Sequence, residues 1–189
     1  MTRWEPGAAE RLAQAALDLY AERGYEQTTV AEIANRAGLT ERTFFRHYAD
    51  KREVLFSGAS ALQQPMVAAV ENAPASAAPI DAVTDGLRAG AAVLEPRRPF
   101  SRTRQTVIAA NPELQERELI KLARLGAALA DALRRRAVPD PAASLTAAAG
   151  IAVFRVAFER WVDESESRQL TDLIEESLGE LKAVTAGVR

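Results

Sequence analysis

Side chains that can bind phosphate and read bases gather in one short stretch of the chain. Arg42, Arg46, His47 and Lys51 lie within ten residues. An arginine can donate two parallel hydrogen bonds to O6 and N7 of guanine, and all four side chains can donate to phosphate oxygens. The stretch therefore indicates contact with DNA, and the elements around it must hold these donors on one surface.

Two short helices joined by a tight turn are predicted around this stretch. Apolar residues recur at helical spacing in the first of them, at Val30, Ile33, Ala34 and Ala37. Thr29 and Glu32 match a capping box, and Gly38 stands where a left-handed C-cap is expected. Thr40 can cap the second helix. Such a pair is a helix-turn-helix unit, whose second helix enters the major groove by its N-terminal residues.

The first turn of the second helix is where side chains reach base edges. Arg42 is the best candidate for reading guanine, a contact worth about 1–3 kcal/mol of discrimination. Glu41 has two interpretations: it could accept from cytosine N4, or stabilise the helix N-terminus through the dipole, which we favour. Arg46 is predicted to contact phosphate, and Phe44 and Tyr48 are predicted to be core.

The charge distribution is more informative than the net charge of −2. Residues 36–52 contain five cations and two anions, a local charge of +3. Residues 159–180 contain eight anions and two cations, a local charge of −6. The basic end could face phosphates, and we interpret the acidic run as a solvated helix face.

The remaining chain shows helical patterns and no strand pattern, so we predict an all-α fold of about nine helices. The predicted helices cover residues 6–23, 30–37, 40–48, 50–71, 81–94, 100–110, 112–137, 142–162 and 168–184. Pro6 suits the first turn of the first helix, and Pro65 is expected to kink the fourth. We predict a three-helix head at residues 1–50 and a helical bundle at residues 51–189.

Several functional classes find no support in the sequence. It has no cysteine and one histidine, no glycine-rich phosphate loop, and no Glu-x-x-His pair for a di-metal bundle. We therefore expect no enzyme activity, no metal and no cofactor. The N-terminus lacks the apolar core of a signal peptide, and the most apolar run, around residues 145–154, is too short to span a bilayer. The expected location is the cytoplasm.

The stretch T-T-V-A-E-I-A-N-R-A-G-L-T-E-R-T-F-F-R-H-Y-A-D-K resembles the helix-turn-helix of TetR-type bacterial transcriptional regulators. The resemblance covers roughly residues 8–56, with Gly24-Tyr25 and Ala37-Gly38-Leu39 at matching offsets. It implies a homodimer that pairs through its last two helices. Each subunit would have a DNA-binding head and a ligand-binding, dimerising body, and ligand in the body would release operator DNA.

The resemblance also assigns DNA contacts. Thr43 carries over as a DNA contact, and His47 as a phosphate contact. Lys51 stands at the predicted N-terminus of the next helix, where backbone N–H groups and an ammonium together favour a phosphate. Phe45 departs from the tyrosine common in the family, so it can pack on sugar or a thymine methyl but cannot donate to phosphate. The full set of predicted DNA contacts is Thr29, Thr40, Glu41, Arg42, Thr43, Phe45, Arg46, His47 and Lys51.

The body offers candidates for an apolar effector pocket. Phe154, Phe158 and Trp161 recur at i, i+4 and i+7, and Phe100, Val107 and Ile108 lie on a neighbouring predicted helix. The alternative is that these side chains are core or dimer-interface residues. We take Phe100, Arg104, Val107, Phe154 and Phe158 as the predicted effector contacts.

Four arginines beside Pro96 also have two interpretations. Arg97, Arg98, Arg102 and Arg104 form either a solvated face or an anion anchor at a pocket mouth. The run R-T-R-Q-T-V-I-A-A-N-P-E-L-Q-E-R is similar to the body of the mycofactocin-regulator subgroup, which implies a response to acyl-CoA.

These features predict a ligand-responsive, DNA-binding repressor that a largely apolar or acyl-CoA-like effector releases from its operator. The alternative is a dimeric helical adaptor, or an activator without release by an inducer. The effector, the operator and the regulated genes are not encoded in any motif of the chain.

Overall fold

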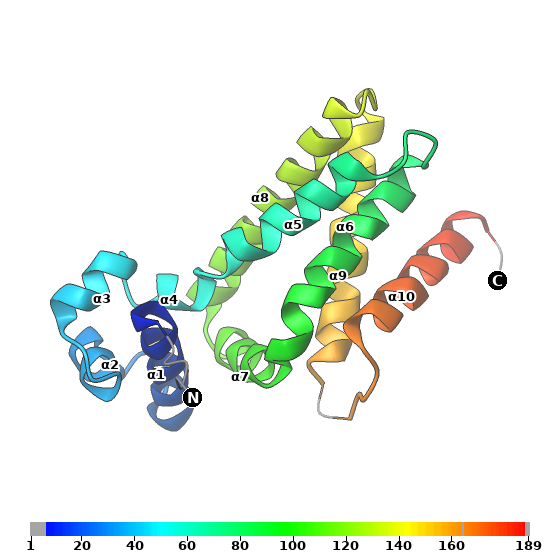
Figure 1. The fold of residues 1–189 in the computed structure, drawn as a ribbon. Coiled ribbons are helices and arrows are strands. Elements are labelled where there is room, and N and C mark those ends of the chain that lie inside the picture. The colour runs from blue at the N-terminus through cyan, green and yellow to red at the C-terminus, as the bar shows by residue number, and fades with distance from the viewer. Residues whose placement is uncertain (1–6, 164, 188–189) are drawn as a thin grey trace, which may run out of the picture. The chain divides into compact units, whose positions relative to one another are not determined.

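A computed structural model describes residues 7–163 and 165–187, and this part of the chain forms α-helices and no strand. The predicted all-α fold is confirmed. The helices are α1 (Ala8–Arg23), α2 (Val30–Arg36), α3 (Glu41–His47), α4 (Glu53–Phe56), α5 (Ala59–Asn72), α6 (Pro79–Leu94), the short 3-10 helix η1 (Glu95–Arg97), α7 (Arg98–Ala109), α8 (Pro112–Arg135), α9 (Ala142–Trp161) and α10 (Leu170–Thr185) (Figure 1). The predicted helix start at Pro6, and Glu164 of the acidic run, lie outside the described residues.

The chain divides into two compact units. Unit 1 contains Met1–Gly58 and Arg102–Glu118, and unit 2 contains Ala59–Ser101 and Leu119–Arg189. Helices α7 and α8 each contribute residues to both units. The proposed boundary between a head and a body after residue 50 stays a prediction, because a compact unit need not coincide with a functional domain.

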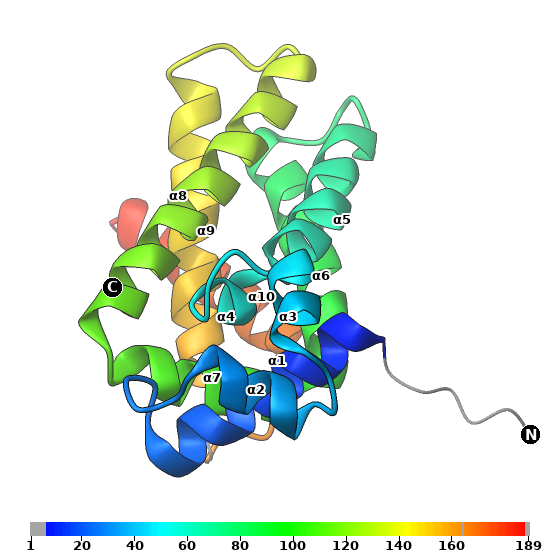
Figure 2. The same ribbon diagram turned by 90° about the vertical axis from the view of Figure 1, so that its left-hand side faces the viewer.

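Unit 1 is built on the three-helix core that the sequence predicts. α2 and α3 both pack against α1, as Figures 1 and 2 show. Leu12, Ile33 and Phe44 are fully buried between them. The turn after α2 is left-handed at Gly38, with φ of +67°, and Leu39 N donates to Ala34 O at 2.8 Å. The predicted glycine C-cap is thus confirmed, and it sets the angle at which α3 leaves α2.

Residues 102–118 complete unit 1 by holding the single turn of α4. Arg104 Nε donates to the carbonyl of Leu55 at 2.7 Å, and its guanidinium lies 5.0 Å from the centre of the Phe56 ring. The Arg117 guanidinium lies 5.9 Å from the same ring and pairs with Glu53. A four-residue helix is not stable alone, so these contacts determine its position.

The sequence predicts one kinked helix over residues 50–71, and the structure places two helices there. Asp50 Oδ1 accepts a hydrogen bond from Glu53 N at 2.9 Å, as expected of a capping residue. α4 then ends at Phe56, and Ser57 Oγ donates back to Val54 O at 3.1 Å. α5 begins at Ala59 and continues through Pro65. The break therefore lies before the proline, at the side-chain-capped end of α4.

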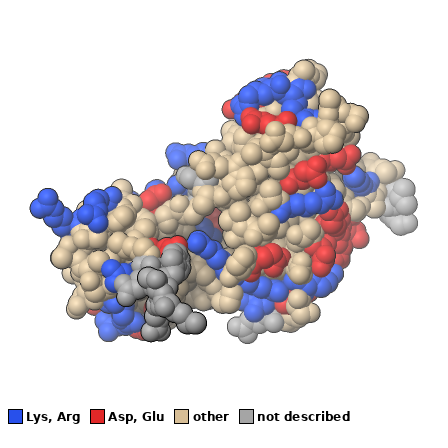
Figure 3. All heavy atoms as spheres, viewed as in Figure 1, with Lys and Arg blue, Asp and Glu red and all other residues tan. Residues whose placement is uncertain are grey.

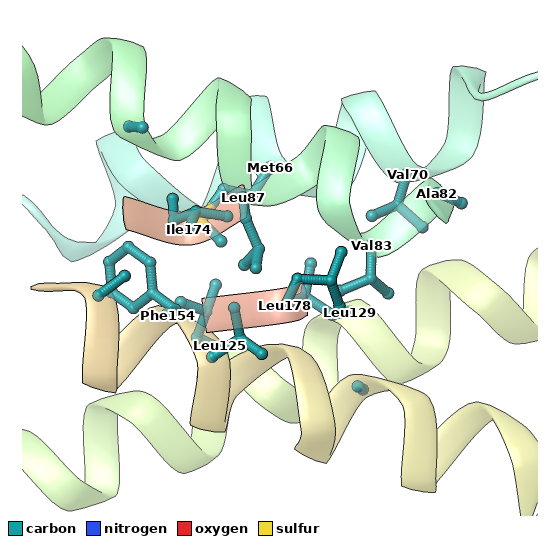
Figure 4. Close-up of a cluster of buried hydrophobic side chains, with 14 of the residues drawn as sticks. Met66, Val70, Ala82, Val83, Leu87, Leu125, Leu129, Phe154, Ile174 and Leu178 are labelled. Atoms are coloured by element: carbon teal, nitrogen blue, oxygen red, sulfur yellow. The ribbon is translucent and has the colours of Figure 1, made fainter. Parts of the chain in front are cut away.

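Unit 2 has one hydrophobic core, to which α5, α6, α8, α9 and α10 contribute (Figure 4). Small residues let the helices approach closely. A Cβ atom added to Gly150 of α9 would lie 2.4 Å from Val83 Cγ1 of α6. The glycine is therefore required by the α6–α9 crossing.

α9 is apolar over a longer stretch than residues 145–154, which the sequence indicates as the most apolar run. An 18-residue window of this 20-residue helix has a mean hydropathy of 1.4, enough in length and composition to cross a membrane, so the apolar run is not confined to residues 145–154. One side of α9 packs into the unit 2 core through Val153, Phe154 and Trp161. Core helices of soluble proteins have this composition too, and it carries no argument for a membrane.

Several carboxylates of the acidic run form ion pairs with arginines of unit 2. Glu175 pairs with Arg88 of α6, and Glu176 pairs with Arg160 and Arg168. Hydrogen bonds from the Arg168 side chain and backbone N–H lower the pKa of Glu166 to about 2. Figure 3 shows the result as alternating blue and red patches over these helices. The run is thus ion-paired in part, which refines its interpretation as a solvated face.

We expect Gly150→Ala to lower the free energy of unfolding by about 1–3 kcal/mol, because the new methyl overpacks against Val83. In a Val83→Ala background the same change should be neutral or stabilising, since alanine exceeds glycine in helix propensity by about 1 kcal/mol. Urea unfolding of the four proteins measures the coupling. Equal effects of Gly150→Ala in both backgrounds would contradict the close contact.

Candidate nucleic-acid interface

The first turn of α3 is fixed by its capping threonine. Thr40 Oγ1 accepts a hydrogen bond from Thr43 N at 3.2 Å, and the two threonine hydroxyls are 3.1 Å apart. Glu41 and Arg42 follow the cap and are exposed, and Thr43 is half-buried. The predicted base-reading turn is therefore preorganised, with its side chains directed out of the core.

The start of α2 is fixed by the predicted capping box. Thr29 Oγ1 accepts from Glu32 N at 3.3 Å, and Glu32 Oε2 accepts from Thr29 N at 2.9 Å. The hydrogen bond from the Thr29 backbone, the largest cause, lowers the pKa of the Glu32 carboxyl. The Thr29 hydroxyl also donates to Glu32 at 2.9 Å, so this predicted DNA contact has an intramolecular partner.

The inner face of α3 anchors the helix to the core. Phe44 is fully buried, and Tyr48 Oη donates to the carbonyl of Ala9 in α1 at 2.8 Å. The two rings lie 5.5 Å apart. The prediction that both residues are core is confirmed.

The outer face of α3 presents cations without intramolecular partners. In the described part of the chain, neither Arg42 nor Arg46 forms an ion pair, whereas three other cations of residues 7–58 do: Arg23 with Glu32, Arg36 with Glu22, and Arg52 with Asp50. Blue side chains project over α2 and α3 in Figure 3. The guanidinium groups of Arg42 and Arg46 are thus available to an external anion.

Phe45 and His47 complete this outer face. Phe45 is 55% exposed, which is unusual for a large apolar side chain, and it packs edge-on against Phe44 at 5.5 Å. His47 is exposed at the end of the helix. An exposed aromatic ring beside two unpaired guanidinium groups suits contact with sugars or thymine methyl groups next to phosphates.

Lys51 differs from the other predicted DNA contacts. Its Nζ atom donates to three carbonyls of the α1–α2 turn: Tyr25 O at 2.9 Å, Glu26 O at 3.2 Å and Thr28 O at 3.2 Å. Sequence reasoning missed this role, because the partners are 23–26 residues away and no motif pairs them with a lysine. Contact of Lys51 with phosphate stays a prediction, and its donors already have partners in the structure.

The predicted effector contacts divide between the two units. In unit 2, Phe154 is buried and Phe158 is half-buried, and their rings stack at 5.9 Å, while Phe100 is half-buried. In unit 1, Val107 is buried, and Arg104 donates to Leu55 O and pairs with Glu118 at 2.8 Å. None of these side chains is assigned a ligand by its geometry alone.

Arg98 is neither part of a solvated face nor free to hold an anion. Its guanidinium donates to the carbonyls of Trp161, Glu166 and Arg168 and lies 5.3 Å from the centre of the Trp161 ring. It therefore fastens the segment between α9 and α10. Residues 7–163 and 165–187 contain no group of three or more His, Asp or Glu side chains placed to hold a metal ion.

Family models match most of the chain. Residues 12–57 match the model described as bacterial regulatory proteins of the tetR family. Residues 77–186 match the model of the MftR C-terminal domain. The first match contains α2 and α3 with all the predicted DNA contacts, and the second contains α6 to α10.

Individual relatives agree with both matches. The chain is 41% identical to the HTH-type transcriptional regulator TcmR of Streptomyces glaucescens over 80 residues, which are 42% of this chain and only 35% of TcmR. It is 27% identical over 166 residues to the mycofactocin biosynthesis transcriptional regulator MftR of Mycobacterium tuberculosis, covering 86% of this chain and 83% of MftR. A solved structure of Thermus thermophilus FadR, a repressor in complex with lauroyl-CoA, is 25% identical with a TM-score of 0.55, covering 92% and 93% of the two chains.

Arg42→Ala should relax sequence preference. The loss of a bidentate guanine contact would reduce discrimination at one base pair by about 1–3 kcal/mol. Competition binding with specific and non-specific duplexes measures this difference. If affinity for both duplexes falls by the same factor, Arg42 contacts phosphate and not a base.

Proposed function

The chain belongs to the tetR family of bacterial regulatory proteins, with an MftR-type C-terminal domain, and on this premise we propose that it is a repressor released from its operator by an acyl-CoA-like effector. Family membership makes it a ligand-responsive, DNA-binding regulator of transcription. The observation that carries DNA contact in this chain is the outer face of α3, where Arg42 and Arg46 have no ion pair within the described residues. The cytoplasm, where its DNA lies, is the proposed location.

Two features support an acyl-CoA-like effector. The solved relative bound to lauroyl-CoA covers 92% of this chain. In unit 2, the aromatic rings of Phe154, Phe158 and Trp161 follow one another along α9 at 5.9 and 5.7 Å. Stacked apolar rings of this kind suit an acyl chain. We propose that Phe100, Phe154 and Phe158, all of unit 2, contact that chain.

A homodimer through α9 and α10 is supported by an apolar surface on α9. Leu145, Ala148, Ala152 and Val156 are all exposed and recur at i, i+3, i+7 and i+11. This spacing places them in one stripe, as in helices that pair with another helix. α10 adds Val184, which is 74% exposed. A second copy of the chain would cover these side chains.

The proposed function is tested with DNA from upstream of the chain's own gene. We expect fluorescence anisotropy to show binding whose affinity falls steeply with salt, because several phosphate contacts release counterions. Lauroyl-CoA should release the DNA, and free coenzyme A, which lacks the acyl chain, should not. A salt slope near zero would favour the adaptor. DNA binding unaffected by acyl-CoA of any chain length would favour an activator or repressor without this effector.

Ala152→Glu should disrupt the dimer. The exposed alanine costs nothing to replace within one subunit, but a carboxylate buried between two copies would be unpaired. We expect sedimentation equilibrium to show at least about a tenfold weaker dimer, with DNA affinity falling in parallel. Ala21→Glu, at an exposed alanine of α1, is the matched control. An unchanged dimer would move the interface away from the α9 stripe.

A further inference from the structure

All three N–H donors of the Lys51 ammonium have a carbonyl acceptor in the structure. An ammonium has three N–H donors and no acceptor. The carbonyls of Tyr25, Glu26 and Thr28 lie 2.9, 3.2 and 3.2 Å from Nζ, which matches the number of donors. Nζ also lies 4.4 Å from the centre of the Tyr25 ring, within the range of a cation–π contact.

The backbone of Lys51 is tied to the same core. Tyr20 Oη of α1 donates to the carbonyl of Lys51 at 2.7 Å. The rings of Tyr20 and Tyr25 meet edge-on at 5.2 Å, and both residues are buried. Burial, the largest cause, raises the pKa of both phenols, so they stay neutral donors over the working pH range. Lys51 is thus held by both its side chain and its backbone.

The carbonyls that accept from Lys51 belong to the turn that immediately precedes α2. Thr28 Oγ1 donates to Gly24 O at 2.9 Å within this turn, and the next residue, Thr29, is the N-cap of α2. α2 in turn sets the direction of α3 through the left-handed Gly38. A shift of this turn would therefore move the start of α2, and with it α3 and the residues predicted to read bases.

We infer that Lys51 is a positioning residue for DNA recognition, which acts by holding the turn before α2 and not by contacting phosphate. This inference rests on the proposed DNA binding and departs from the phosphate contact that the sequence predicts. To donate to a phosphate, the ammonium would have to release one of its carbonyls and leave it unpaired, which opposes the exchange. Arg46, with no ion pair in the described chain, meets no such obstacle.

The salt dependence of DNA affinity distinguishes a positioning role of Lys51 from a direct contact with phosphate. A direct contact contributes about 0.9 to the slope of log K against log salt, so losing one per subunit removes about 1.8 from a dimer. We compare Lys51→Met with Arg46→Met, which removes a cation from the exposed face of α3. The probe is the duplex from upstream of the chain's own gene, at a temperature where circular dichroism shows every variant folded.

For Lys51→Met we expect a lower melting temperature and about tenfold weaker binding, with the salt slope of the unaltered protein. For Arg46→Met we expect an unchanged melting temperature and a slope smaller by about 1.8. If Lys51→Met also lowers the slope by about 1.8, Lys51 contacts phosphate and the inference is overturned. If it lowers the melting temperature but leaves the affinity of the folded protein unchanged, Lys51 is only structural and the inference is again wrong.

Tyr25→Leu keeps the experiment decisive if Lys51→Met does not fold. It removes the ring beside Nζ and leaves every cation in place, so weaker binding with an unchanged slope is expected. Unchanged binding would contradict the inference. Failure of the unaltered protein to bind this DNA would instead reject the proposed function, and the two failures are distinguishable because the second needs no variant.

Discussion

The ammonium of Lys51, shared among three carbonyls of the α1–α2 turn, is the interaction on which the DNA-binding unit depends. Segments between helices carry carbonyls that no helix satisfies, and they need donors from elsewhere. Unit 2 solves the same problem with arginines. Arg98 donates to carbonyls at and after the end of α9, and Arg136 donates to the carbonyls of Glu71, Ala73 and Pro74 at and after the end of α5. These cations are part of the fold and are not surface charges.

This use of cations explains how a chain of net charge −2 can offer a DNA-binding face. Most cations considered above are occupied by carboxylates or carbonyls, including Arg36, Arg52 and Lys51. The acidic residues of α10 are occupied in turn by Arg88, Arg160 and Arg168. On α3, Arg42 and Arg46 are exposed and form no ion pair with the described residues. We propose that recognition depends on these two guanidinium groups of one short helix, repeated in the proposed dimer.

The parts that sequence reasoning predicted correctly are local. The capping box at Thr29, the cap at Thr40 and the glycine turn at Gly38 involve residues at most five apart, and each is present in the structure. The parts it missed are contacts between distant residues. Lys51 meets the turn 23–26 residues before it, and Arg104 meets Leu55 across 49 residues. No periodicity records such pairs, so the membership of residues 102–118 in unit 1 was not predictable. The break between α4 and α5 was missed for the same reason, since Arg104 holds the end of α4.

We infer that the cations of unit 1 have separate tasks: Arg42 and Arg46 of α3 bind DNA, and Lys51 holds the fold. Side-chain nitrogen signals in a nitrogen-15 NMR titration with the upstream duplex test it most directly. We expect the Nε signals of Arg42 and Arg46 to move on addition of DNA, and the Nζ signal of Lys51 to stay in place. Movement of the Lys51 signal, with those of Arg42 and Arg46 unchanged, would contradict it.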